Sequence, residues 1–222
     1  MSSNKVKNVK AYTGTRPDVI KQLQNPKKVL DVGCNEGALG ESIKAIFPES
    51  YVVGIDYNSE AIEVAKNRIN EAYTIDLENA TALPAFLEEK TFDTIICADV
   101  LEHIRFPWKV VEQLYSHLSE DGKIIISLPN FGFWESFFHL LNQKLPMRDR
   151  GIYDDTHLRF FMRKNLPSLA PKHSTFKIAD RNYRLKETGK TPIDKVFIPI
   201  LNKLPFFRDL ITFQFIVTIE KK

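Results

Sequence analysis

Short apolar runs alternate with stretches of helical spacing over the first 130 residues of the chain. The first run, KKVLDVG, is nearly continuous and ends in Asp and Gly, which is typical of a strand buried on both faces. The stretches between the runs repeat apolar residues every three to four positions, as an amphipathic helix does. The pattern predicts strands at residues 27–33, 51–56, 72–76, 91–99 and 123–129, and helices at 16–23, 36–47, 58–69 and 107–118. A turn is expected at 120–122.

Strands that alternate with helices predict an open parallel sheet with helices on both faces. The rhythm changes after Pro129, where an aromatic-rich segment without a strand pattern reaches Phe161 and suggests a lid or binding loop. Later segments predict a strand at 176–187, a helix at 194–204 interrupted by Pro199, and a last strand at 213–220. We expect one domain over 1–222, with a cofactor-binding half at 12–130, a lid or acceptor insertion at 130–165, and C-terminal strands and a helix at 166–222.

Composition narrows the class of protein further. Hydrophobic residues make up 43% of the chain and charged residues 27%, which excludes a disordered chain. The net charge of +3 is too small to indicate nucleic-acid binding by itself. No apolar run is long enough for a transmembrane segment, and the first residues are polar, so secretion is not expected. Only Cys34 and Cys97 are present, which excludes a disulfide framework and favours a reduced, cytoplasmic setting.

Acidic residues stand at the ends of three predicted strands. They are Asp31, Asp56 and Asp76, and ligands of open α/β sheets bind at these carboxyl ends. A tight turn with Gly33 and Gly37 follows Asp31 and leads into a helix, whose first amides are free donors. Asp56 lies 25 residues after Asp31, where an acid can accept hydrogen bonds from ribose hydroxyls. The pattern indicates a nucleoside-binding site.

Two nucleoside cofactors compete for this site. A nicotinamide dinucleotide needs G-x-G-x-x-G for its pyrophosphate, whereas positions 33, 35 and 38 are Gly, Asn and Ala. S-adenosylmethionine has no phosphate and carries an ammonium group, which Asp31 could hold directly or through water. The D-x-G-x-x-x-G pattern therefore fits the cationic nucleoside better.

Four segments resemble the successive motifs of class I S-adenosylmethionine-dependent methyltransferases. They are VLDVGCNEGALG (29–40), VVGIDYNSEAI (52–62), FDTIICADVLEHIRFPWKVV (92–111) and DGKIIISLPN (121–130). The resemblance covers about residues 12–130 and implies a Rossmann-like sheet of about seven strands, mostly parallel with an antiparallel last strand. It departs from the family at Asn35, where glycine is usual, but Asn tolerates positive φ.

A further block resembles one bacterial and archaeal subgroup of this family. YDDTHLRFF (153–161), together with LPNFGFW upstream, is similar to methionine-biosynthesis-associated methyltransferase-like proteins and to enzymes encoded among polysaccharide genes. This subgroup resemblance favours a sugar or related metabolite as the acceptor.

The family resemblance implies a cofactor role for each strand end. Asp31, Gly33 and Gly37, with the backbone at Cys34 and Asn35, would form the cofactor loop. The other expected contacts are Asp56 on the ribose, Tyr57 and Leu77 against the adenine, Asp76 on its amino group, Ala98 and Asp99 beneath the methionine portion, and Arg16 on the carboxylate. For Arg16 a simple surface cation is the competing interpretation.

The acceptor side is predicted from the lid. His157 lies in a polar cluster with Tyr153, Asp154, Asp155 and Arg159, and Asp155 is taken as its partner. A histidine held by an acid is a competent general base near neutral pH. A purely structural cluster that pins the lid is an equal alternative. His103, Trp134, Tyr153 and Arg159 are further candidates for substrate contact. The aromatic residues of the lid would line an acceptor pocket or form the lid's own small core.

No metal site is expected. Asp99, Glu102 and His103 could hold a divalent cation, but oxygen-rich Mg²⁺ sites use more carboxylates. A hydrogen-bonded pair of Glu102 and His103 that stabilises the loop is the simpler interpretation.

Together these patterns predict an S-adenosylmethionine-dependent methyltransferase that acts on a small-molecule acceptor, at an oxygen of a sugar or related metabolite. The fourth strand ends in Cys97-Ala98-Asp99-Val100 and lacks the N/D-P-P-aromatic loop of many amino-methylating nucleic-acid enzymes. DNA is therefore not expected as a substrate, whereas RNA stays open. Two alternatives are a catalytically silent cofactor-binding partner of another enzyme and a nicotinamide-dependent oxidoreductase. The oligomeric state is not indicated.

Overall fold

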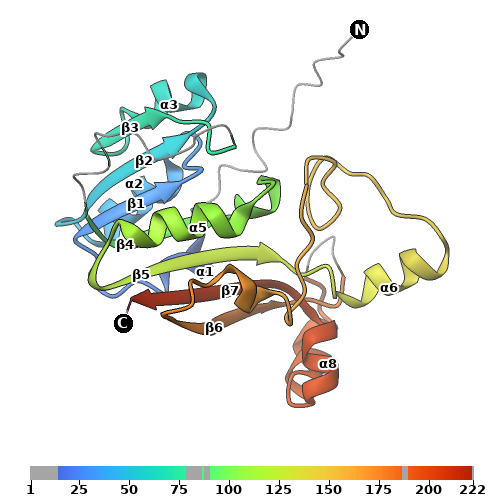
Figure 1. Ribbon diagram of the computed structural model, residues 1–222. Helices are drawn as coiled ribbons and strands as arrows, with labels where there is room; N and C mark the ends of the chain where they lie inside the picture. Colours follow the sequence, from blue (N-terminus) through green and yellow to red (C-terminus); the bar gives the residue numbers. More distant parts are fainter. Residues whose placement is uncertain (1–14, 79–86, 88–90, 187–189, 222) are drawn as a thin grey trace, which may run out of the picture.

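The computed structural model describes residues 15–78, 87, 91–186 and 190–221. Its described strands form one seven-stranded sheet in the order β3-β2-β1-β4-β5-β7-β6 (Figure 1). The strands are β1 (Lys28–Val32), β2 (Tyr51–Asp56), β3 (Glu71–Thr74), β4 (Phe92–Ala98), β5 (Leu118–Pro129), β6 (Ser174–Tyr183) and β7 (Thr212–Lys221). The polar lead-in at residues 1–10 lies outside the described residues.

The first five strands pair in parallel, while β7 runs antiparallel to both of its neighbours, β5 and β6. This confirms the predicted open, mostly parallel sheet with an antiparallel last strand. The parallel register sets Asp31 beside Gly54 and Asp56 beside Thr74. The carboxyl ends of the central strands therefore share one edge of the sheet.

Helices cover both faces of the sheet. The described helices are α1 (Pro17–Ile20), α2 (Ala38–Ile46), α3 (Ser59–Ala65), η2 (Leu101–His103), α5 (Pro107–Ser116), α6 (Trp134–Leu141), η3 (Leu166–Leu169), α7 (Asp194–Leu201) and α8 (Pro205–Leu210). One core packs α5 and η3 against the sheet, and a second packs α1, α2 and α3 against the other face. Alternate residues of β1 serve the two cores, with Leu30 and Val32 on the first and Val29 on the second. Burial of each such side chain contributes about 1.5–3 kcal/mol.

Several boundaries differ from those predicted. The turn expected at 120–122 lies inside β5, where Asp121 takes a φ of 58° and the register with β4 shifts. The single helix expected at 194–204 is two helices, because Leu204 precedes Pro205 and is held extended, so that α8 starts anew at the proline. Asn58 caps α3 as predicted, since its side chain accepts the N–H groups of Glu60 and Ala61.

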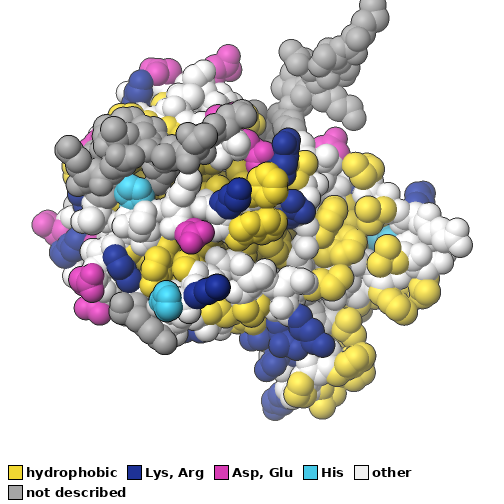
Figure 2. All heavy atoms as spheres, viewed as in Figure 1, with side chains coloured by type: hydrophobic (Ala, Val, Ile, Leu, Met, Phe, Trp, Pro, Cys, Tyr) yellow, Lys and Arg dark blue, Asp and Glu magenta, His cyan; other side chains and the backbone are white. Residues whose placement is uncertain are grey.

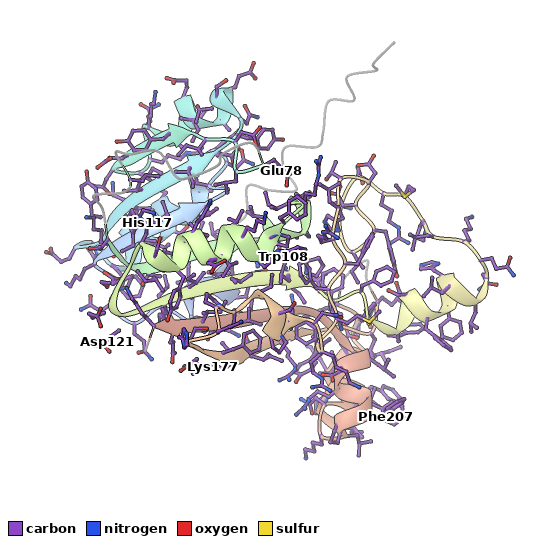
Figure 3. All side chains as sticks on the ribbon, in the orientation of Figure 1. Glu78, Trp108, His117, Asp121, Lys177 and Phe207 are labelled. Atoms are coloured by element: carbon purple, nitrogen blue, oxygen red, sulfur yellow. The ribbon has the colours of Figure 1, made fainter. Side chains whose placement is uncertain are left out.

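The lid segment after β5 contains the unpredicted helix α6. Figure 1 places α6 and the loop that follows it beyond the carboxyl end of β5, and α8 projects from the same end of the molecule. Hydrophobic side chains gather over α6 and α8 (Figure 2), and Phe206 is 75% exposed. Phe207, on α8, likewise lies away from the sheet (Figure 3). No helix in the described part of the chain has the length and apolar character that crossing a bilayer requires.

Candidate cofactor and acceptor site

The loop between β1 and α2 takes the left-handed backbone conformation at three positions. Gly33 has a φ of 70°, Asn35 of 48° and Gly37 of 79°. A Cβ on Gly33 would lie 2.3 Å from Cγ2 of Val100, so that no larger residue fits there without rearrangement. Asn35 keeps the turn that glycine usually makes, as predicted.

Asp56 fixes this loop to the end of β2. Its Oδ2 accepts the N–H of Asn35 at 2.9 Å, and its Oδ1 accepts the N–H of Asn58 at 2.9 Å. The N–H groups of Gly33 and Cys34 donate to the carbonyl of Ile55 at 2.8 and 3.1 Å. The carboxylate predicted to bind ribose therefore also organises the loop.

Asp31 is a buried acid whose charge is not fully compensated. Its side chain is 2% exposed, and Oδ2 has no hydrogen-bond partner among the described residues. Burial and the nearby carboxylate of Asp56 raise the pKa of Asp31 to about 7, although Arg16 acts in the opposite direction. A positively charged ligand group would stabilise the ionised form of Asp31, whereas an anionic one would be repelled.

Arg16 belongs to a partly buried network at the ends of β4 and β5. Its Nη1 donates to Oδ2 of Asp99 at 2.5 Å, and its Nη2 donates to Oγ of Ser127 at 2.7 Å. Ser127 and the side-chain amide of Gln214 both donate to Oδ1 of Asp99, at 2.8 and 2.6 Å. Burial opposes the charge of Arg16, but the carboxylates of Asp99 and Asp18 outweigh it and raise the arginine pKa. Arg16 thus holds the strand ends together.

Ser127 and Gln214 were missed by the sequence analysis. The signal that could have found them is a polar residue inside an apolar strand, because a buried polar side chain needs a partner.

Four other residues predicted to contact the cofactor lie farther along the same edge. Tyr57 follows β2 and is 74% exposed. Asp76 is exposed, and its Oδ1 accepts the N–H of Glu78 at 2.9 Å, which shapes the turn after β3. Leu77 packs partly against the core, and Ala98 is half-buried at the end of β4. The contacts of these four residues with the cofactor stay predictions.

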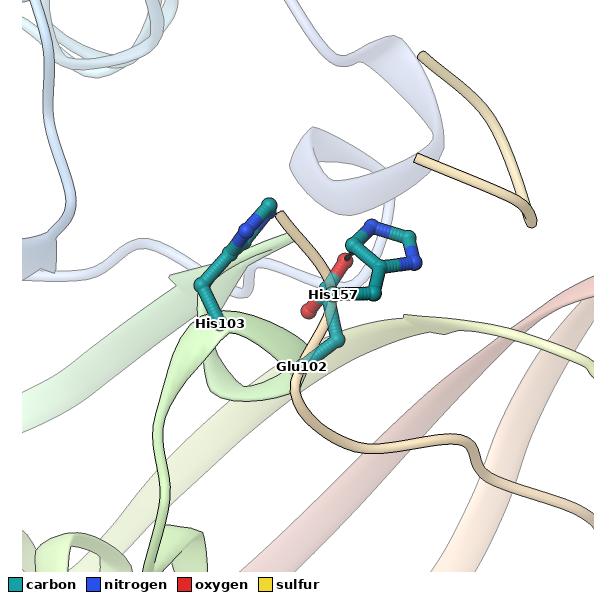
Figure 4. Close-up of side chains that lie close together, drawn as sticks. All are labelled: Glu102, His103 and His157. Atoms are coloured by element: carbon teal, nitrogen blue, oxygen red, sulfur yellow. Dashed lines mark ion pairs between the residues drawn. The ribbon is translucent and has the colours of Figure 1, made fainter. Parts of the chain in front are cut away.

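The lid docks on η2, the short turn that follows β4. The N–H groups of Leu158 and Arg159 donate to the backbone carbonyl of Glu102 at 2.8 and 3.0 Å. This docking brings His157 beside His103, with ring centroids 4.8 Å apart, and places its Nε2 3.9 Å from Oε1 of Glu102 (Figure 4). Burial and the neighbouring His103 lower the pKa of His157, so that it is neutral near pH 7.

The predicted partnership of His157 with Asp155 is not what the structure shows. Asp155 is exposed, and its backbone N–H donates to the carbonyl of Arg148 at 2.8 Å. Asp154, which is 3% exposed, and Glu102 are the acids near His157. Adjacent residues of a tight turn point in different directions, and the sequence does not reveal which one faces inward.

Tyr153 and Trp134 form the inside of the lid. Tyr153 is 2% exposed, and its hydroxyl lies 2.7 Å from Oγ of Ser136. It belongs to a small core with Phe133 and Trp134, and the indole of Trp134 donates to the carbonyl of Leu185 at 2.9 Å. These contacts agree with the alternative in which the aromatic residues of the lid form a small core of their own.

Arg159 ties the lid to α5. Its guanidinium donates to the carbonyl of Arg105 at 2.8 and 2.6 Å and lies 5.4 Å from the ring centre of Trp108. Trp108 stands near the start of α5, facing the lid side of the molecule (Figure 3). Arg159 is therefore engaged in positioning the segment that carries His157.

Comparison with known proteins agrees with this geometry. A family model described as a methyltransferase domain matches residues 23–196. A ubiquinone biosynthesis O-methyltransferase of Glaesserella parasuis is 36% identical over 110 residues, which are 47% of this chain and 46% of that protein. The protein of the same name from Paraburkholderia xenovorans is 30% identical over 176 residues, covering 77% of this chain and 72% of that protein. The chain spans about half the length of the first curated relatives that it matches.

Solved structures share the fold at low sequence identity. The plantazolicin methyltransferase BpumL in complex with SAH superposes with a TM-score of 0.59 at 18% identity, covering 99% of this chain and 87% of that one. A SAM-dependent methyltransferase from Archaeoglobus fulgidus gives a TM-score of 0.60 at 17% identity, covering 96% and 94%. With the family match over most of the chain, the strand order and the glycine loop show that this protein belongs to the class I S-adenosylmethionine-dependent methyltransferase family.

Proposed function

We propose that this protein transfers a methyl group from S-adenosylmethionine to a hydroxyl oxygen of a small molecule. The observation that carries the proposal is the buried Asp31, with one unpartnered oxygen and Asp56 close by. Two acids at adjoining strand ends favour a cation and disfavour a pyrophosphate, which supports the sulfonium nucleoside over a dinucleotide. S-adenosylmethionine, when bound, supplies a methyl carbon made electrophilic by its sulfonium.

Each residue at the strand ends would bind a different part of the cofactor. Asp31 would hold the ammonium and Asp56 the ribose hydroxyls, while Asp76 would accept from the adenine amino group. Tyr57 and Leu77 would cover the two faces of the ring. Alignment of acceptor and methyl group by such contacts can supply about 7–11 kcal/mol of the barrier.

The acceptor assignment is supported by two considerations. The curated relatives carry the name O-methyltransferase, which favours oxygen. An alcohol must lose its proton, and His157 is the predicted base because its lowered pKa keeps it neutral at pH 7. The finer prediction of a sugar hydroxyl rests on the subgroup resemblance and stays a prediction.

Isothermal titration with S-adenosylhomocysteine, followed by a methyl-transfer screen against hydroxylated metabolites, tests the proposal. We expect saturable binding of S-adenosylhomocysteine, none of NAD⁺, and transfer to at least one hydroxyl compound. His157→Gln should lower turnover about 10²–10⁴-fold with cofactor affinity unchanged, as loss of a general base does. Binding without transfer, together with a co-purifying enzyme, would instead indicate a silent regulatory partner.

A further inference from the structure

We propose that Glu102, His103 and His157 form a binding site for a divalent first-row transition-metal ion. Each side chain offers one ligand atom, and these atoms all lie within 4.8 Å of one another. Figure 4 shows the two imidazole rings on either side of the Glu102 carboxylate. The site joins the turn after β4 to the lid, with His157 in the place of Asp99, which the sequence had suggested as the partner of Glu102 and His103.

Both histidines are oriented as metal ligands are. Nδ1 of His157 lies 3.1 Å from the carbonyl of Ile152, which can only accept, so this nitrogen carries the proton. Nδ1 of His103 lies 3.0 Å from the hydroxyl of Thr156, which donates its own proton to Asp154 and must therefore accept from the histidine. In each neutral ring the lone pair is consequently on Nε2. Protein groups that bind the other ring nitrogen in this way commonly orient metal-ligating histidines.

Glu102 supplies an independent indication of a missing positive charge. Its side chain is 1% exposed, and Oε2 has no hydrogen-bond partner in the described part of the chain. Burial of a carboxylate is costly unless a proton or a cation compensates it. A bound divalent ion would compensate the charge and satisfy the orphan oxygen.

The ligand set determines the class of ion. Two imidazoles and one carboxylate suit Zn²⁺, Mn²⁺, Co²⁺ or Fe²⁺ better than Mg²⁺ or Ca²⁺, which prefer oxygen ligands. Ligand atoms of a tetrahedral ion at about 2.1 Å stand about 3.4 Å apart. The ligand atoms, which lie up to 4.8 Å apart, would therefore have to approach one another by up to about 1.4 Å. Three protein ligands also leave a coordination position for a further group, as catalytic metal sites do.

This position suggests what the ion would do, a step that rests on the proposed function. The acceptor hydroxyl would occupy the open position, where the ion lowers the hydroxyl pKa so that the proton leaves to solvent. The oxygen would then attack the methyl carbon as the carbon–sulfur bond breaks, with the electron pair going to sulfur. With the ion bound, His157 would be a ligand, so its role as the base under the proposed function applies to the protein without the ion.

Metal binding can be measured without any activity assay. Purified protein is first stripped with a chelator and dialysed, and then titrated with Co²⁺ followed by visible absorption, and with Zn²⁺, Mn²⁺ and Mg²⁺ followed by thermal unfolding. Glu102→Gln, His103→Gln and His157→Gln remove one ligand each, while His173→Gln, at an exposed histidine on another part of the chain, is the matched control.

We expect one equivalent of Co²⁺ to give ligand-field bands, and Zn²⁺ or Mn²⁺ to raise the melting temperature by several degrees. Each ligand variant should bind these ions at least tenfold more weakly than the wild type, whereas His173→Gln should bind them as the wild type does. If Glu102→Gln does not fold, circular dichroism will show it, and the two histidine variants decide the question. The site is refuted if the wild type responds to none of these ions, if Mg²⁺ matches them, or if the ligand variants bind as the wild type does. Metal binding without methyl transfer would leave the site standing and count against the proposed function alone.

Discussion

Asn in place of Asp31 should stabilise the ligand-free protein and at the same time weaken cofactor binding. Burial and Asp56 raise the pKa of Asp31 from 3.8 to about 7. The native protein therefore keeps this proton up to about pH 7, while the unfolded chain releases it near pH 3.8. Between these values a rising pH favours the unfolded chain, so that the acid lowers the free energy of unfolding progressively.

The size of the effect follows from the two pKa values. A difference from 3.8 to about 7, at about 1.4 kcal/mol for each pH unit, corresponds to about 4 kcal/mol. Asparagine is uncharged at every pH and resembles the protonated acid. The stability of Asp31→Asn relative to the wild type should thus increase by about 4 kcal/mol from pH 4 to pH 7 and then level off.

Urea unfolding followed by circular dichroism at a series of pH values measures this difference directly, because other titrating groups are common to both proteins. In parallel, the variant should bind S-adenosylmethionine about 10–100-fold more weakly, since a charged hydrogen bond of about 1.5–3 kcal/mol is lost. A stability difference that stays constant from pH 4 to pH 8 would refute the assignment of a buried, protonated Asp31.

Substitutions at three further positions test the strand-end site. Asp56→Asn should weaken binding of S-adenosylhomocysteine about tenfold or more in calorimetry, and wild-type affinity would argue against its ribose contact. Gly33→Ala should cost about 2–5 kcal/mol in chemical denaturation, because its φ is +70° and the new Cβ meets Val100 at 2.3 Å; an unchanged midpoint would contradict this packing. Arg16→Met should lower the free energy of unfolding by about 2–3 kcal/mol, because it leaves the partly buried carboxylate of Asp99 without its cation. The stability of Arg16→Lys should lie between those of the wild type and Arg16→Met. Equal stability of these three proteins would contradict a stabilising role of the network.

The sheet was predictable because its signals are local. Continuous apolar runs such as that ending at Asp31, and the cap at Asn58, are fixed by burial and hydrogen bonding within a few residues. The helix α6 was not predictable in the same way. The segment is aromatic-rich and follows the last parallel strand, and most of its apolar side chains, including Phe137 at 60% exposure, do not pack on the sheet, so the alternation of strands and helices did not identify it.

The sequence predicted the arrangement of site residues only where they lie close together in the chain. Asp31 lies near the end of β1, and Gly33 and Gly37 lie in the tight turn that follows, as the sequence predicts. Their contacts with the cofactor stay predictions. By contrast, the cluster of Glu102 with His157 depends on the docking of two segments far apart in the chain, and Arg16 reaches Asp99 across 83 positions. Such contacts follow from tertiary packing, which sequence spacing does not encode.

The most direct measurement is a crystal structure of the protein with S-adenosylhomocysteine. The ammonium should lie within hydrogen-bond distance of Asp31, directly or through one water, and the ribose hydroxyls should lie on Asp56 at the ends of β1 and β2. A structure in which the nucleoside binds elsewhere, or in which a diphosphate compound fills the strand ends, would contradict the central claim that this edge of the sheet holds a cationic nucleoside.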